Sequence, residues 1–177
     1  MKTYIFLFIS LLAFLFIQGC STKVPLKQVL IEKGHKYNVN YKTLHAICMK
    51  ESSLKPFVVN VNKSIFNIQK GGHYFDNAFS ANLYMDTVLD PLNLNYDIGL
   101  CQINKIHLKK NNLDNEDMLD FEKNIDMAAR IYKYNVRVCK NDVVCALSMY
   151  NTGKKNSSVG KKYAQKVLKI RKKLYGN

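Results

Sequence analysis

Apolar residues recur at helical spacing along most of this chain, and no stretch alternates convincingly with a period of two. The clearest example follows Asn40, where one helical face carries Leu44, Ile47, Cys48 and Glu51. Residues spaced three and four apart share a face only in a helix, and asparagine is a good N-cap. The spacing therefore predicts a mainly α fold.

Five other segments show the same periodicity, and together with the one above we expect helices over about 25–37, 41–52, 77–89, 125–136, 143–152 and 161–175. Asp76, Asn124 and Asp142 are the expected N-caps, and Gly153 is an expected left-handed C-cap. The stretch 58–74 shows no helical period and contains two adjacent glycines, so we expect a loop there.

The N-terminal segment predicts export. After Lys2, an apolar run over 4–17 is too short for an ordinary membrane span and has the proportions of a signal-peptide core. Gly19 before Cys20 resembles the lipobox of bacterial lipoproteins, which implies that Cys20 is diacylated and becomes the mature N-terminus. An uncleaved anchor is the alternative interpretation of this segment.

On the lipoprotein interpretation, residues 1–19 are a signal peptide, 20–24 a lipidated linker and 25–177 one domain, large enough for one core and too small for two. Ser21 stands where the inner-membrane retention signal would be Asp. In a Gram-negative host we therefore expect attachment to the outer membrane, facing the periplasm.

Glu51 is poorly placed for stability. It falls at the C-terminal end of its helix, where the dipole disfavours a carboxylate, and on the apolar face, where burial disfavours the charged form. Both effects raise a carboxyl pKa, and a carboxyl that stays protonated near neutral pH can act as a general acid. The alternative is that Glu51 reaches solvent where the helix ends.

Four segments resemble, in the same order, motifs of the soluble lytic transglycosylase domain. They are Glu-Ser-Ser-Leu-Lys-Pro with a nearby Val-Asn (51–60), Asp-Ile-Gly-Leu-Cys-Gln-Ile-Asn (97–104), Ser-Met-Tyr-Asn-Thr-Gly (148–153) and Tyr-Ala-Gln-Lys-Val-Leu (163–168). In the second segment Cys101 replaces the usual Met. The resemblance covers about 25–174 and implies a lysozyme-like, mainly α domain with a substrate groove.

The resemblance implies that Glu51 is the single catalytic acid and base. Such an enzyme breaks the bond between N-acetylmuramic acid (MurNAc) and N-acetylglucosamine (GlcNAc) in peptidoglycan, and it closes a 1,6-anhydro ring without water. It requires no metal and no cofactor. The substrate-binding residues implied are Ser53, Gly99, Cys101, Gln102, Asn104, Tyr150, Asn151 and Tyr163.

The residue types suit these roles. Gly99 allows close approach of backbone to a sugar, and the Gln102 amide can bond to N-acetyl and hydroxyl groups. Tyr150 and Tyr163 offer an apolar face and a hydroxyl that can reach a catalytic carboxylate. We expect Cys101 to line the same groove. The plainer alternatives are that Asn151 is only part of a helix end and that Tyr163 is only core.

Two other functions remain open. If Asp97 approached Glu51 across the groove, lysozyme-type hydrolysis would become available. A non-catalytic lipoprotein could also bind peptidoglycan by shape alone. The chain lacks the Glu-Thr pair that precedes the last motif in the family, and the spacing between its first two motifs is long. Both departures resemble the small transglycosylases that accompany conjugation, secretion or pilus machines.

Charge and cysteines give further expectations. Without Lys2, 26 basic and 13 acidic residues remain, which favours lipid head groups or peptidoglycan carboxylates over nucleic acid as partners. We expect a monomer. We favour a Cys139–Cys145 disulfide, whereas Cys48 and Cys101 are either paired or buried free thiols. The histidines show no metal-ligand spacing.

Overall fold

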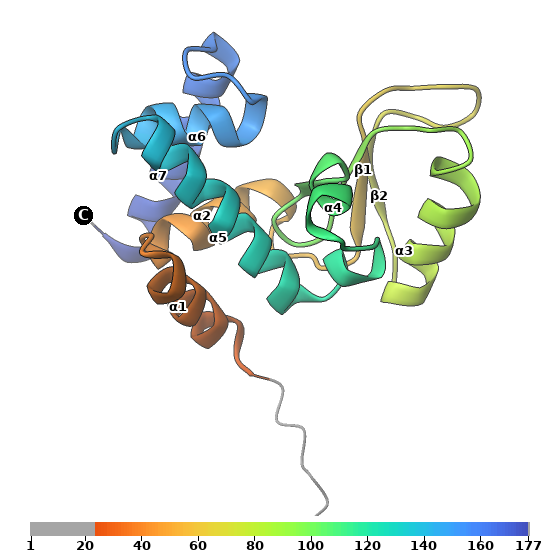
Figure 1. Cartoon of the computed structure of the whole chain (residues 1–177), viewed down its shortest axis with the longest axis horizontal. Coiled ribbons are helices and arrows are strands. Elements are labelled where there is room, and N and C mark those ends of the chain that lie inside the picture. The colour runs from red at the N-terminus through yellow and green to blue at the C-terminus, as the bar shows by residue number, and fades with distance from the viewer. Residues whose placement is uncertain (1–23, 177) are drawn as a thin grey trace, which may run out of the picture.

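The computed structural model describes residues 24–176, so the expected signal peptide and Cys20 lie outside the described residues. The described part is mainly α, as predicted (Figure 1). Its helices are α1 (Leu26–Tyr37), α2 (Tyr41–Ser52), α3 (Ala78–Tyr84) with a π-helical continuation (Met85–Leu89), α4 (Ile106–Asn111), a 3-10 turn (Glu116–Met118), α5 (Phe121–Val138), α6 (Val143–Thr152) and α7 (Ser158–Tyr175).

Several expected helix ends are confirmed. The Asn40 side chain accepts hydrogen bonds from the backbone N–H groups of Lys42 at 2.9 Å and Thr43 at 3.3 Å, which caps α2. Asp142 caps α6 in the same way. Gly153 ends α6 with φ 69°, the left-handed conformation that glycine adopts at least cost.

Two expected N-caps were wrong. Asp120 caps α5, which therefore begins at Phe121, and Asn124 is fully buried within the helix. The neighbouring Asn77, and not Asp76, caps α3. Because Asn and Asp cap helices about equally well, two candidates a few residues apart cannot be separated by residue type alone.

A small sheet replaces the loop that we expected. Four short antiparallel strands lie in the order β2-β1-β3-β4, formed by Gly71–Tyr74, Val58–Val61, Tyr96–Ile98 and Ile103–Asn104. β1 is buried at three of its four positions and therefore does not alternate, which hides it from a period-two search. The register pairs Asn60 with Asp97, and Asp97 with Asn104. One row across the sheet thus carries three polar side chains.

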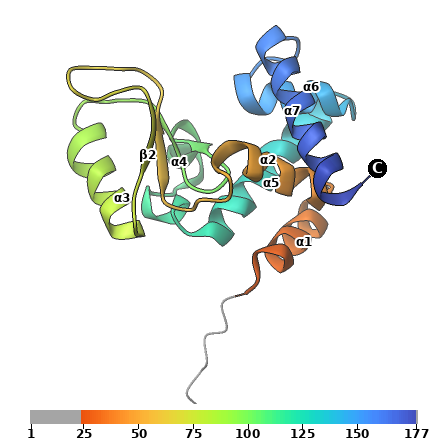
Figure 2. The same ribbon diagram turned by 180° about the vertical axis from the view of Figure 1, so that it is seen from behind.

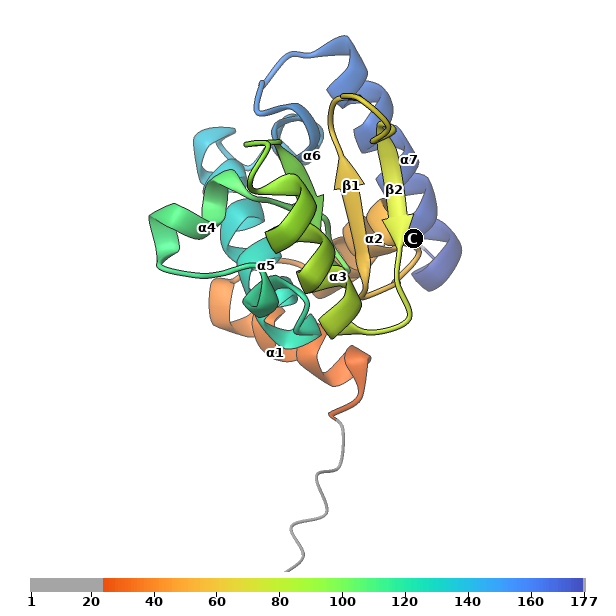
Figure 3. The ribbon, with the colours of Figure 1, turned by 90° about the vertical axis from the view of Figure 1, so that its right-hand side faces the viewer.

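The molecule has a helical side and a sheet side. In Figure 1, α1, α2, α6 and α7 lie to the left and the β1–β2 hairpin with α3 lies to the right. From the sheet side, α3 and the hairpin stand in front of the helices (Figure 3). Seen from behind, α2 lies in the centre (Figure 2), and it packs against α1, α5 and α7. The end of α2 therefore lies where the two sides meet.

Two disulfides connect elements that form the site. Cys139–Cys145 joins the end of α5 to α6, which confirms the favoured pairing. Cys48–Cys101 joins α2 to the segment between β3 and β4, which decides between the two alternatives for these cysteines. Among the helices of residues 24–176, none is both long and apolar enough to span a bilayer.

Candidate active site

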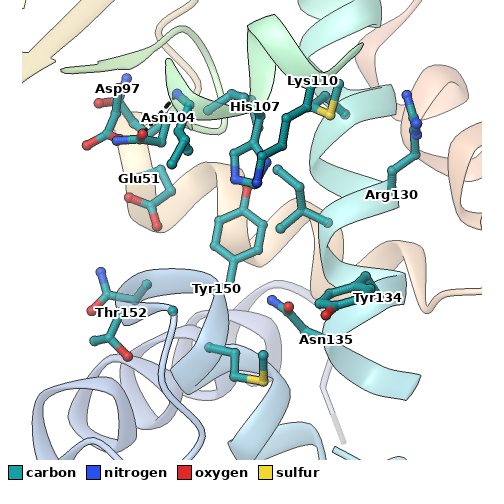
Figure 4. A pocket seen from close by; sticks show the side chains of 18 of the residues that line it. Glu51, Asp97, Asn104, His107, Lys110, Arg130, Tyr134, Asn135, Tyr150 and Thr152 are labelled. Atoms are coloured by element: carbon teal, nitrogen blue, oxygen red, sulfur yellow. Dashed lines mark hydrogen bonds between the residues drawn. The ribbon is translucent and has the colours of Figure 1, made fainter. Parts of the chain in front are cut away.

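A groove of about 1080 Å³ lies between the sheet side and the helical side. It is lined from the end of α2, the strands β1, β3 and β4, and the helices α4, α5 and α6. Figure 4 shows Glu51 and Asp97 on one side of this groove and Arg130 on the other, with Tyr150 and His107 between them. The groove is therefore lined both by segments that carry the sequence motifs and by α4 and α5, which carry none.

Glu51 is the next-to-last residue of α2 and lines the groove. The pKa of its carboxyl is raised to about 7, chiefly by burial and to a smaller extent by the nearby Asp97. The Tyr163 hydroxyl donates a hydrogen bond to Glu51 Oε1 at 2.5 Å, and this bond and the charge of Lys50 oppose the rise. The sequence predicted a raised pKa, and the structure shows burial to be its main cause.

Asp97 lines the same groove, in the middle of the polar row of the sheet. Its carboxylate accepts from Asn104 Nδ2 at 2.6 Å and from Asn60 Nδ2 at 3.4 Å. Burial raises the pKa of Asp97, while these amides and the nearby His107 oppose the rise. Two partly desolvated carboxyl groups thus face one cavity.

Gly99 has a packing role that was not expected from the sequence. It has φ 77° and is not among the residues that line the groove. A Cβ at this position would lie 2.3 Å from the Met118 carbonyl oxygen and 2.4 Å from Asn124 Nδ2. Close packing inside the protein therefore requires glycine at this position, and its predicted role beside a sugar stays a prediction.

Gln102 lines the groove with a left-handed backbone, φ 52°. Its side-chain nitrogen donates to the carbonyl oxygens of Gly99 at 2.8 Å and Val58 at 3.2 Å. The amide nitrogen is thus engaged within the protein, and the carbonyl of this side chain is the group left for a ligand.

Cys101 does not line the groove, contrary to our expectation. Its side chain is fully buried because it forms the disulfide with Cys48. Its carbonyl oxygen accepts from the Tyr150 hydroxyl at 3.0 Å. Tyr150 lines the groove as expected, but it bonds to this backbone group and not to Glu51.

The other predicted site residues divide into two groups. Asn104 and Asn151 line the groove. Ser53 and Tyr163 do not: Ser53 is an exposed left-handed C-cap of α2, and Tyr163 is buried and holds Glu51 through its hydroxyl. The substrate-binding role of each of these residues stays a prediction.

Asn124 is a supporting residue that the sequence analysis missed. Its side-chain nitrogen donates to the carbonyl oxygens of Ile98 at 2.9 Å and Met118 at 2.8 Å, and its oxygen accepts from the Cys101 backbone N–H at 2.8 Å. Two of these bonds thus tie the segment that carries Gln102 to α5, and the third ties the 3-10 turn to the same amide. The only signal in the sequence was a polar residue on an otherwise apolar helical stripe.

Part of the groove wall was also missed. His107, Lys110, Arg130 and Tyr134 line it from α4 and α5, which carry none of the recognised motifs. Within residues 24–176, no cluster of three His, Cys, Asp or Glu side chains is arranged to hold a metal ion.

Comparison with known proteins identifies the family. The family model of the transglycosylase SLT domain matches residues 28–172. The chain therefore belongs to the transglycosylase SLT domain family, whose lysozyme-like, mainly α fold agrees with the structure. At the level of the family, this supports a lytic transglycosylase-type action on peptidoglycan. Searches of curated proteins and of solved structures returned no match.

Proposed function

We propose that this protein cleaves the β-1,4 bond between MurNAc and GlcNAc in peptidoglycan without water and leaves a 1,6-anhydroMurNAc end. The observation that carries the proposal is Glu51: a carboxyl with a pKa of about 7, on the wall of a large groove, held by Tyr163. Near neutral pH a carboxyl with that pKa is present in both its protonated and its ionised form. A residue that acts first as an acid and then as a base needs both forms.

The reaction has two proton transfers. Protonated Glu51 donates its proton to the glycosidic oxygen while the bond from that oxygen to the muramoyl C1 breaks. The Glu51 carboxylate then takes the proton of the muramoyl 6-hydroxyl, whose oxygen bonds to C1 and closes the ring. Glu51 is thereby protonated again. The Tyr163 hydroxyl holds the carboxyl in place through both steps.

The pH dependence follows from the raised pKa. The acid form of Glu51 starts the reaction, so kcat/KM should fall as pH rises through about 7. Removing the Tyr163 hydroxyl with Tyr163→Phe removes a bond that lowers the pKa of Glu51, so the fall should move to higher pH. The measurement is kcat/KM against pH for both proteins. A fall that moves to lower pH in the variant would contradict the role given to this bond.

Hydrolysis of lysozyme type is the second candidate, because Asp97 faces the same groove as Glu51. On the non-hydrolytic mechanism Asp97 acts only through its charge, which raises the pKa of Glu51. Asp97→Asn should therefore lower the rate far less than loss of Glu51. Mass analysis of released muropeptides gives the decisive readout, since anhydro and reducing ends differ by one water. Reducing ends, together with an equal loss in both variants, would favour hydrolysis.

We also propose that the protein is a lipoprotein of the outer membrane, attached through Cys20 and facing the periplasm. The sequence around Gly19 and Cys20 supports this. Cys20→Ala should abolish incorporation of a labelled fatty acid and release the protein from the membrane fraction, with Cys20→Ser as a second variant that keeps a small polar side chain. Label retained in both variants would contradict acylation at this residue.

A further inference from the structure

The end of the groove away from Glu51 carries two positive charges from two helices. Lys110 extends from α4 and Arg130 from α5, and both side chains line the groove. Figure 4 shows Arg130 on the opposite side of the cavity from Glu51, and Lys110 beside His107. Neither cation belongs to a motif on which the proposed reaction rests.

The position of Arg130 follows from the periodicity of α5. Met127, Arg130, Ile131 and Tyr134 all line the groove, at the three- and four-residue spacing of one helical face. Neither acid on the same helix lines the groove: Glu122 lies in its first turn, and the Asp126 carboxylate accepts from Lys36 Nζ and the Tyr37 hydroxyl on α1, both at 2.6 Å. The groove face of α5 therefore carries a cation and no acid.

Among residues 24–176, neither cation has an acidic partner. The ion pairs formed by residues 24–176 involve other lysines, namely Lys33, Lys36, Lys105 and Lys123. Burial and the charge of Lys110 lower the pKa of His107, although Asp97 opposes this, so the imidazole adds little positive charge near neutral pH. Lys110 and Arg130 thus leave a net positive end in the groove.

We propose that Lys110 and Arg130 bind free carboxylates of the peptide stems on the glycan strand, so that this end of the groove selects strands whose stems carry negative charge. The inference rests on the proposed function, because it names what the same groove recognises. The linked sugar rings are uncharged, whereas the stems bear carboxylates. Arg and Lys form charge-assisted hydrogen bonds with carboxylates, and two cations on different helices fix both position and direction.

The test measures binding, in the Glu51→Gln protein so that no cleavage intervenes. The probes are soluble peptidoglycan fragments with free stem carboxylates and the same fragments after conversion of the carboxylates to carboxamides. The parent protein should bind the free-carboxylate fragments about tenfold more tightly, as two partly exposed charge pairs would give. Lys110→Ala with Arg130→Ala should remove most of that preference and leave binding of the carboxamide fragments unchanged.

Matched controls are Lys109→Ala and Lys133→Ala. They remove the same charge from the same two helices at positions that do not line the groove, so they should keep the preference. The proposal would be overturned if the parent did not bind the fragments or showed no preference between them. It would also be overturned if the double variant kept the preference or if the controls lost it equally. Cleavage of both fragments by the protein with Glu51 tests the proposed function separately.

Discussion

Glu51→Gln should lower the rate of glycan cleavage by about two to four powers of ten, the usual contribution of general acid–base catalysis. The amide fills nearly the same space and can still accept the hydrogen bond from Tyr163, but it has no proton that it can deliver to a glycosidic oxygen. Release of muropeptides from purified peptidoglycan measures the loss. The matched control is Glu32→Gln, the same chemical change at an exposed position on α1, which should leave the rate unchanged.

The difference in stability between this variant and the parent protein should depend on pH. The pKa of Glu51 rises from 4.5 to about 7 on folding, so its favourable contribution is complete below 4.5 and is lost as pH rises through 7. Gln does not titrate. As pH rises from 4.5 through 7, the unfolding free energy of the parent should therefore fall relative to that of Glu51→Gln. Urea unfolding at acid and mildly alkaline pH tests this.

For catalysis, normal turnover by a folded Glu51→Gln protein would show that Glu51 has no part in the mechanism.

The same variant separates an enzyme from a protein that only binds peptidoglycan. A pure binder gains nothing from a carboxyl whose charged form is disfavoured by burial, and it would show no cleavage before or after the change. For an enzyme, Glu51→Gln should abolish cleavage and retain binding.

Most of the helices could be predicted from sequence because their signals are local, whereas the short helix α4 was not expected. Asn40, Asp142 and Gly153 act at the ends where they were expected, since capping depends on one residue and its nearest backbone groups. The sheet could not be predicted in this way. Its strands span two to four residues, and the pairing of Asn60 with Asp97 is set by contacts between segments far apart in the chain.

The candidate site was predicted in part for the same reason. The position of Glu51 at a helix end and on an apolar face can be derived from a few residues, and so can its raised pKa. Which motif residues touch the groove depends on the tertiary structure. Cys101 is turned inward by its disulfide, whereas Lys110 and Arg130 reach the groove only because α4 and α5 meet the sheet there.

The motif around Gly99 illustrates how a residue can support a groove without lining it. Gly99 packs against Asn124, which bonds to the Cys101 N–H and so fixes the segment leading to Gln102. The Cys101 carbonyl in turn anchors the hydroxyl of Tyr150. Damage at Gly99 should therefore reach two groove-lining side chains through the backbone.

Gly99→Ala should lower the free energy of unfolding by about 2–5 kcal/mol, the sum of about 1–2 kcal/mol for a left-handed residue with a Cβ and about 1–3 kcal/mol for overpacking. The added carbon would meet the Met118 carbonyl at 2.3 Å, and a backbone oxygen cannot move aside as a flexible side chain can. Gly153→Ala is the matched control: its φ of 69° is equally left-handed, but nothing lies within 4 Å of the added carbon. Gly153→Ala should therefore lower the free energy of unfolding only by the cost of the left-handed backbone, about 1–2 kcal/mol. Equal losses of stability in urea unfolding of the two variants would show that close packing on Asn124 is not why glycine is needed at position 99.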